Sequence, residues 1–79
     1  MIDLKGTLAN IARAIVDNPE EVVVTVIEES ENAISLKLSV AAPDMGKVIG
    51  KHGKIAKAIR QLMKAAANGT GKKVTIDIE

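Results

Sequence analysis

The sequence predicts an α+β fold, in which a single domain carries all its helices on one face of a three-stranded sheet. Three observations support this prediction. The chain has 79 residues, the length of one domain. Its hydrophobic residues make up 47% of the chain and include no Phe, Trp or Tyr, so the core must be aliphatic. Hydrophobic periodicity changes along the chain between that of a helix and that of a strand, in the order α-β-β-α-α-β.

The first half of the chain predicts one helix followed by two strands. Apolar residues recur at helical spacing over about residues 4–16, and Asp3 can cap the first turn. Pro19 ends this helix because it disfavours helical conformation in the residue before it. A β-branched run predicts a strand at about residues 21–28, and strict alternation predicts another at about 33–40. Their short polar connection predicts an antiparallel hairpin.

The second half predicts two helices and a last strand. Asp44 can cap a short helix at about residues 45–49, and a turn framed by glycines follows at 50–53. A longer helix is expected at about residues 54–67, and alternation predicts a strand at about 73–78. The buried stripe of the longer helix is expected to comprise Ile55, Ala58, Ile59, Leu62, Met63 and Ala66.

Charge is strongly segregated along the chain, although the formal net charge is only +1. Residues 1–46 carry a net charge of −5, whereas residues 47–73 carry eight basic residues and no acidic one. Such segregation indicates a face that attracts anions, and the alternative is an ordinary solvated helix face. Without aromatic rings, any bound nucleic acid must be held by charge, backbone amides and aliphatic contacts.

The turn Gly50–Gly53 is the strongest candidate site. Glycine allows positive φ where two helices meet, and it has no Cβ to keep a sugar–phosphate backbone away. The helix that begins near residue 54 directs its unpaired N–H groups at the turn, where a phosphate fits. Lys51 adds charge and His52 can donate a hydrogen bond. The alternative is a tight corner between helices with no ligand.

Residues 48–59, Val-Ile-Gly-Lys-His-Gly-Lys-Ile-Ala-Lys-Ala-Ile, resemble the signature of KH domains. The predicted element order resembles the bacterial, type II topology, and the resemblance covers essentially the whole chain. It is greatest to the small stand-alone proteins of the KhpA family. The resemblance implies binding of about four nucleotides of single-stranded RNA or DNA between the turn, its flanking helices and a strand.

The resemblance also implies roles for particular residues. The turn would contact the nucleic-acid backbone, and Ile55 would contribute to the apolar floor of a base groove. One position departs from the pattern, because many KH domains have Ile three residues after the second glycine, where this chain has Ala56. The expected RNA-binding residues are Gly50, Lys51, His52 and Gly53, with Lys47, Lys54, Lys57, Ile49 and Ile55 around them.

Other functions are expected to be absent. The carboxylates form no nucleophile–base–acid group, so we expect no enzyme. A single His and no Cys predict neither a metal site nor a cofactor. No apolar run is long enough to span a membrane, and a cytoplasmic location is the default expectation.

The resemblance implies that the chain is an RNA-binding protein that acts as an RNA chaperone or post-transcriptional regulator, and two alternatives to this function remain open. The first is a module for protein interaction, because the family implies a homodimer or a heterodimer with a KH protein of the Jag or KhpB type. The second is a binder of single-stranded DNA, since only contacts to the ribose 2′-hydroxyl distinguish the two ligands. The family also suggests a link to cell division and cell shape.

Overall fold

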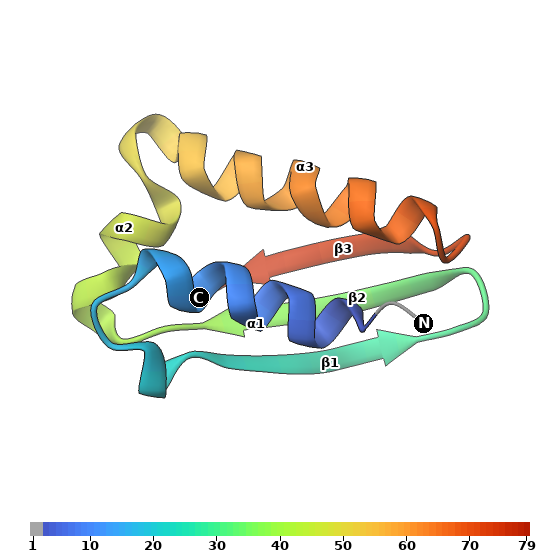
Figure 1. Cartoon of the computed structure of the whole chain (residues 1–79), viewed down its shortest axis with the longest axis horizontal. Coiled ribbons are helices and arrows are strands. Elements are labelled where there is room, and N and C mark those ends of the chain that lie inside the picture. The colour runs from blue at the N-terminus through green and yellow to red at the C-terminus, as the bar shows by residue number, and fades with distance from the viewer. Residues whose placement is uncertain (1–2) are drawn as a thin grey trace.

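The computed structural model describes residues 3–79, and within them it contains three α-helices and one three-stranded sheet (Figure 1). The α-β-β-α-α-β order and the α+β class expected from the sequence are confirmed. The elements are α1 (Leu4–Ile15), β1 (Val23–Glu29), β2 (Ala33–Ser39), α2 (Met45–Ile49), α3 (Lys54–Asn68) and β3 (Lys73–Ile78).

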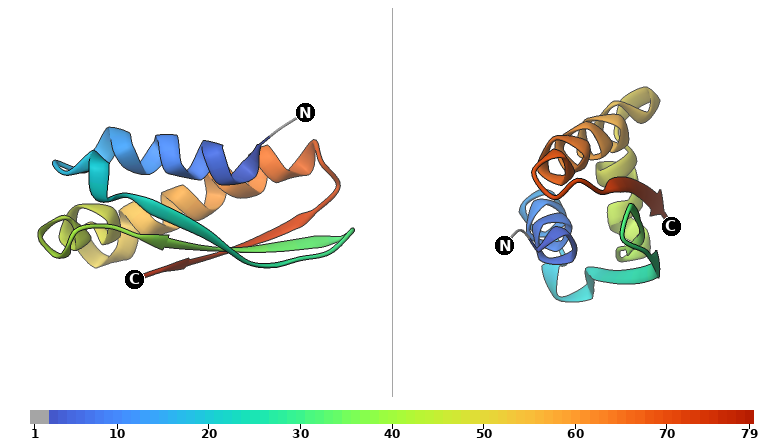
Figure 2. Two further views of the ribbon diagram at one scale, coloured as in Figure 1. Left: turned by 90° about the horizontal axis from the view of Figure 1, so that it is seen from below. Right: turned by 90° about the vertical axis from the view of Figure 1, so that its right-hand side faces the viewer.

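The sheet has the strand order β1-β2-β3, and the two long helices α1 and α3 cover the same face of it (Figure 2). Strands β1 and β2 form the expected antiparallel hairpin, while β3 pairs with β2 in parallel. A parallel pair needs a long crossover connection, and here α2 and α3 supply it. The crossover places the junction of α2 and α3 beyond one end of the sheet (Figure 1).

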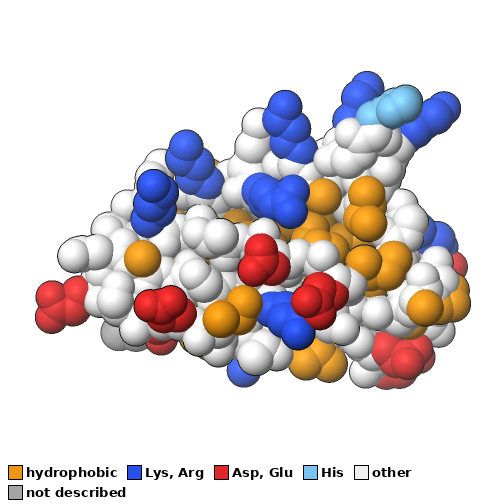
Figure 3. Space-filling model, turned by 180° about the vertical axis from the view of Figure 1, so that it is seen from behind, with side chains coloured by type: hydrophobic (Ala, Val, Ile, Leu, Met, Phe, Trp, Pro, Cys, Tyr) orange, Lys and Arg blue, Asp and Glu red, His pale blue; other side chains and the backbone are white. Residues whose placement is uncertain are grey.

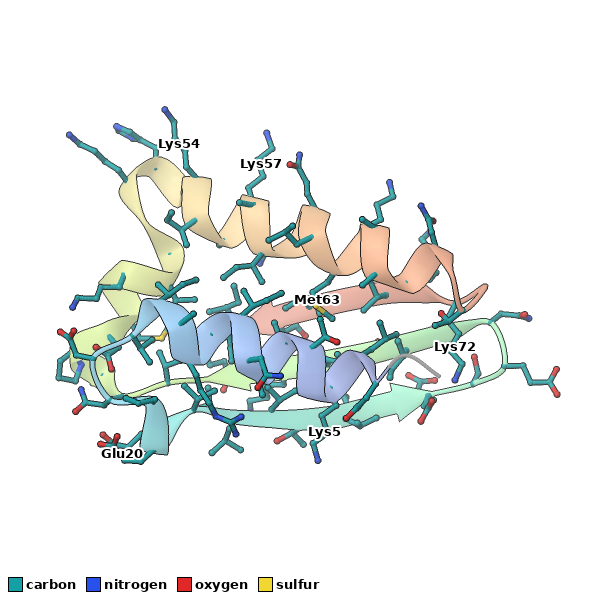
Figure 4. The ribbon with its side chains drawn as sticks, in the orientation of Figure 1. Lys5, Glu20, Lys54, Lys57, Met63 and Lys72 are labelled. Carbon is teal, nitrogen blue, oxygen red and sulfur yellow. The ribbon has the colours of Figure 1, made fainter. Side chains whose placement is uncertain are left out.

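The aliphatic core lies between the sheet and the helices. Leu36 and Leu38 of the central strand β2 are completely buried, as is Leu8 of α1. From α3, Ile59 and Met63 fill the space between the helices and the sheet, and Figure 4 shows the Met63 side chain pointing inward. Only one face of β2 packs against the helices, so buried residues alternate with less buried ones along the strand, which explains why its pattern predicted a strand clearly.

The start of β1 differs from the expectation of a strand from about residue 21. Residues Pro19–Glu21 form a short 3-10 helix, closed by a hydrogen bond from the Glu21 N–H to the Asn18 carbonyl at 3.0 Å, and the strand begins at Val23. Proline has a fixed φ near −65° that suits the first position of a helical turn. The β-branched run therefore starts its strand two residues later than predicted.

The buried face of α3 also differs from the predicted stripe. Its buried residues are Ala56, Ile59, Met63 and Ala67, whereas Ile55, Ala58 and Leu62 are exposed. The helix contains enough alanine and aliphatic residues to support two adjacent apolar stripes. Contact with β3 and α1 selects one of them, and the sequence pattern alone does not distinguish the two.

Asp44 is not a side-chain cap for α2, contrary to the prediction. Its carboxylate, in a residue only 1% exposed, accepts hydrogen bonds from the backbone N–H groups of Asp17 (3.2 Å) and Asn18 (3.0 Å) and from the Asn18 amide (3.0 Å). Asp44 therefore fastens the loop after α1 to the start of α2. By contrast, Asp3 caps α1 as predicted, because its carboxylate accepts a hydrogen bond from the Gly6 N–H.

The pKa of Asp44 follows from these contacts. Burial raises the pKa of the carboxyl, but the hydrogen bonds from Asn18 and Asp17 and the charge of Lys47 outweigh burial, so the pKa lies below its ordinary value. A carboxyl whose pKa is lowered by folding contributes its full stabilisation at pH values above the pKa that it has in the unfolded chain. That stabilisation is lost as pH falls through the folded pKa.

We therefore expect Asp44→Asn to lower the thermal midpoint at neutral pH, because an amide cannot accept all three hydrogen bonds. The difference in thermal midpoint between parent and variant should become smaller as pH falls below about 4, the ordinary pKa of aspartate. Thermal unfolding followed by circular dichroism across this range measures both effects. Asp77→Asn, an exposed carboxylate on β3, is the matched control and should behave as the parent does. If the difference in thermal midpoint is the same at all pH values, the ionised Asp44 carboxylate does not stabilise the fold in this way.

Candidate nucleic-acid interface

The GxxG turn (Gly50–Gly53) joins α2 to α3 with three residues at positive φ. Gly50 has φ 71° and ψ −178°, His52 has φ 57° and ψ 29°, and Gly53 has φ 73° and ψ 12°. The Gly53 N–H donates to the Gly50 carbonyl at 3.4 Å and closes the turn. His52 is the one residue other than glycine with positive φ among residues 3–79, a conformation in which His is enriched together with Asn and Asp. The His52 side chain is exposed at the turn, as is that of Lys51.

Gly50 is required for a second reason, because the Ile55 side chain packs directly on it. A Cβ on Gly50 would lie 2.3 Å from Ile55 Cγ1 and 2.7 Å from Ile55 Cβ. At Gly53, in contrast, a Cβ would meet nothing within 4 Å. The first glycine thus allows a close approach inside the protein, whereas the second leaves open space on the side where a ligand would approach.

The N-terminus of α3 faces this turn without a capping side chain. Its N-cap residue is Gly53, and its first turn contains no acidic residue. A helix of 15 residues carries a partial positive charge at this end, together with N–H groups that have no partner inside the helix. Lys54 and Lys57 add full charges beside it. This arrangement suits a phosphate.

The turn projects from the body of the protein, as Figure 1 shows, and its basic side chains are exposed to solvent. Lys51, His52, Lys54 and Lys57 are all exposed. In Figure 4 the labelled Lys54 and Lys57 extend away from the sheet, and in Figure 3 blue side chains follow the rim formed by the turn and α3. Acidic side chains lie on the lower part of that view, over the sheet. The charge segregation of the sequence is thus also a segregation in space.

Ion pairs remove some cations from this surface. Lys47 pairs with Asp17, and Lys72 pairs with Glu29 at 2.5 Å, so both ammonium groups are held by carboxylates of the acidic half. Lys47 was among the expected RNA-binding residues, and its charge is directed to the loop after α1. Within residues 3–79, the other six cations of the segment 47–73 make no ion pair: Lys51, Lys54, Lys57, Arg60, Lys64 and Lys73.

The two predicted apolar residues flank the turn. Ile49, the last residue of α2, is 40% exposed, and Ile55, in the first turn of α3, is 38% exposed. Ala56, where many KH domains have Ile, is 6% exposed and belongs to the buried stripe of α3. The structure therefore places the departure from the family pattern in the core under the turn.

Arg60 was not among the expected RNA-binding residues, and the sequence distinguished it only as one of the eight basic residues of the segment 47–73. The Arg60 Nε donates to the backbone carbonyl of Ile76 in β3 at 3.3 Å. Because a helix turns about 100° per residue, Ile55 and Arg60 lie about 140° apart around α3. The Ile55 side chain and the β3 edge thus border different flanks of α3. No signal in the sequence links Arg60 with Ile76.

Among residues 3–79, no cluster of three or more His, Cys, Asp or Glu side chains could hold a metal ion. The helices in this part of the chain are also too short or too polar to cross a membrane.

Comparison with known proteins identifies relatives over nearly the whole chain. Residues 5–78 match the family model described as "KhpA/KhpB, KH domain". Three bacterial relatives carry the name "RNA-binding protein KhpA". The relative from Clostridium acetobutylicum is 51% identical over 75 residues, which cover 95% of this chain and 99% of the relative. Those from Listeria monocytogenes (46%; 95% and 97% covered) and Treponema pallidum (48%; 90% and 88% covered) are similar.

Proposed function

Because the chain belongs to the KhpA/KhpB family of KH domains, we propose that it binds single-stranded RNA and holds the sugar–phosphate backbone at the GxxG turn. The observation that carries the proposal is the uncapped, basic N-terminus of α3 at a projecting turn. The chain acts on cytoplasmic RNA as a chaperone or post-transcriptional regulator. Its proposed activity is binding, without catalysis.

In this mechanism a phosphate approaches the open side of Gly53 and accepts hydrogen bonds from the first N–H groups of α3. Lys51, Lys54 and His52 supply charge and further donors around it. Contacts of this kind fix the position and direction of the strand without reading its sequence. Affinity therefore comes largely from the turn, and any base preference has to come from side chains farther along the groove.

Titration of a fluorescent single-stranded RNA at several salt concentrations tests the proposal. Log affinity should fall linearly with log salt, with a slope of about −0.7 for each phosphate neutralised on a single strand. Competition with DNA of the same sequence shows whether the ribose 2′-hydroxyl is read. An affinity that does not change with salt, or no RNA affinity at all, would rule out backbone binding at the turn.

A second activity, self-association, is supported by the exposed apolar flank of α3. Leu62 is 56% exposed and lies two helical turns after Ile55, which is 38% exposed. We propose that this flank pairs with a second copy of the chain or with a KH domain of the Jag or KhpB type. Light scattering should report a dimer for the parent and a monomer for Leu62→Gln. A parent that stays monomeric at high concentration contradicts self-association.

A further inference from the structure

We infer that Arg60 reads bases: its guanidinium selects nucleotides that present two adjacent hydrogen-bond acceptors, namely guanine and cytosine. The inference rests on the proposed RNA binding and deepens it, because the GxxG turn itself has no means of distinguishing bases. It follows from the way in which the structure holds the Arg60 side chain.

Arg60 bridges α3 and the free edge of the sheet. Among residues 3–79, β3 is an edge strand, so the carbonyls along its outer side have no strand partner in this part of the chain. The Arg60 Nε donates to one of them, that of Ile76, at 3.3 Å in a partly buried contact. This bond restrains the long side chain against β3, whereas the neighbouring Lys57 and Lys64 have no such partner among residues 3–79.

The hydrogen-bonding capacity of Arg60 is mostly unused. A guanidinium has five N–H donors, and within residues 3–79 only the one on Nε has a partner. No carboxylate in this part of the chain pairs with it. The two terminal amino groups therefore present a planar pair of donors to solvent. Two donors at fixed spacing match a ligand that offers two adjacent acceptors.

Arg60 lies within reach of a strand held at the turn. Arg60 lies seven positions after Gly53, a rise of about 10 Å along the helix axis. A KH turn and groove hold about four nucleotides, so a strand gripped at the turn extends past this position. The face that contains β3 also exposes hydrophobic side chains below the turn, against which bases can pack (Figure 3). One nucleic-acid strand can therefore place its phosphates at the turn and its bases at the edge of β3.

The chemistry of the bases then determines the preference. Guanine offers O6 and N7 side by side, the commonest partner of arginine in nucleic-acid recognition. On single strands the Watson–Crick edge is also accessible, and there cytosine offers O2 and N3. Adenine places an amino donor beside N7 and N1, and uracil places its N3–H between two carbonyls. Each of these two bases therefore places a hydrogen-bond donor opposite the donors of the guanidinium, and two donors cannot bond to each other.

The test compares uridine oligonucleotides, slightly longer than the four nucleotides of a KH groove, whose central bases are replaced by guanine, cytosine or adenine. Binding is measured by fluorescence anisotropy. The parent should bind the guanine or the cytosine oligonucleotide at least about fivefold more tightly than the adenine and all-uridine ones, the lower range for a bidentate contact. The guanine and cytosine arms show which acceptor pair is read.

Three variants separate base reading from the effect of charge. Arg60→Lys keeps the charge but loses the planar pair of donors. It should therefore bind all four oligonucleotides equally, with the salt dependence of the parent. Lys64→Gln, one helical turn away, should weaken all four to a similar extent and preserve their ranking. Thermal unfolding verifies that each variant folds, and Arg60→Gln is a second variant in which the preference should also be lost.

Three results would overturn the inference: equal affinity of the parent for all four oligonucleotides, a preference that survives in Arg60→Lys, or a ranking that Lys64→Gln abolishes as completely. These outcomes can be distinguished from failure of the proposed RNA binding itself. If RNA binding fails, the parent binds none of the oligonucleotides at either low or high salt.

Discussion

Replacing both Lys51 and His52 with aspartate is expected to abolish RNA binding and to leave the fold intact. Each side chain is exposed at the tip of the GxxG turn, and each can donate a hydrogen bond to a phosphate. Hydrogen bonds to charged groups contribute about 1.5–3 kcal/mol each, so losing two of them weakens binding by about a hundredfold or more. The two carboxylates also repel the backbone, which increases the loss.

Neither residue contributes to the core, so the thermal midpoint of this double variant should stay close to that of the parent. The matched control is Lys5→Asp with Arg13→Gln on α1, which changes the formal charge by the same amount on exposed positions away from the turn. The control should lose far less affinity. If both double variants lose affinity equally, net charge attracts the RNA and the turn has no special role.

Gly50→Ala should be the most destabilising substitution in the GxxG turn. The backbone of Gly50, at φ 71° and ψ −178°, lies in a region that is essentially restricted to glycine and costs other residues about 1–3 kcal/mol. The new methyl group would also lie 2.3 Å from Ile55 Cγ1, and overpacking of this kind adds about 1–3 kcal/mol. A domain of this size has a total stability of about 4–12 kcal/mol. The variant should therefore lose a large share of its stability.

Denaturant unfolding of a glycine series measures the effect. Gly53→Ala should cost only about 1–2 kcal/mol, because its φ is positive but its Cβ would meet open space. Gly46→Ala, on an exposed helical position, should stabilise by about 0.5–1 kcal/mol. Gly50→Ala combined with Ile55→Ala removes the overlap with Cγ1, but it retains the 2.7 Å approach to the Cβ of residue 55 and the backbone strain, so it should recover only part of the lost stability. Equal losses for the Gly50 and Gly53 variants would show that the packing of Ile55 on the turn has no energetic role.

The element order could be predicted from sequence because it depends on local chemistry. Alternation in the central strand, the β-branched run before it and the helical spacing in α1 each reflect a period of the backbone itself. The GxxG turn was also predictable, since glycine is the residue that positive φ requires. Charge segregation along the chain predicted the basic rim because four of the eight basic residues of the segment 47–73 lie on α3, and Lys51 lies on the turn that leads into it.

The structure alone decided how these elements face one another. The parallel pairing of β3 with β2, the choice of Ala56 over Ile55 for the buried face of α3, and the pairing of Lys47 with Asp17 join residues that no local pattern relates. Asp44 reaches Asn18 across 26 positions, and Arg60 reaches Ile76 across 16. Such contacts arise when whole elements pack, because packing selects among faces that the sequence leaves equally apolar or equally charged. The position of the proposed phosphate site was therefore determined by the local sequence, whereas the surface next to it, which we propose reads bases, was created by the tertiary fold.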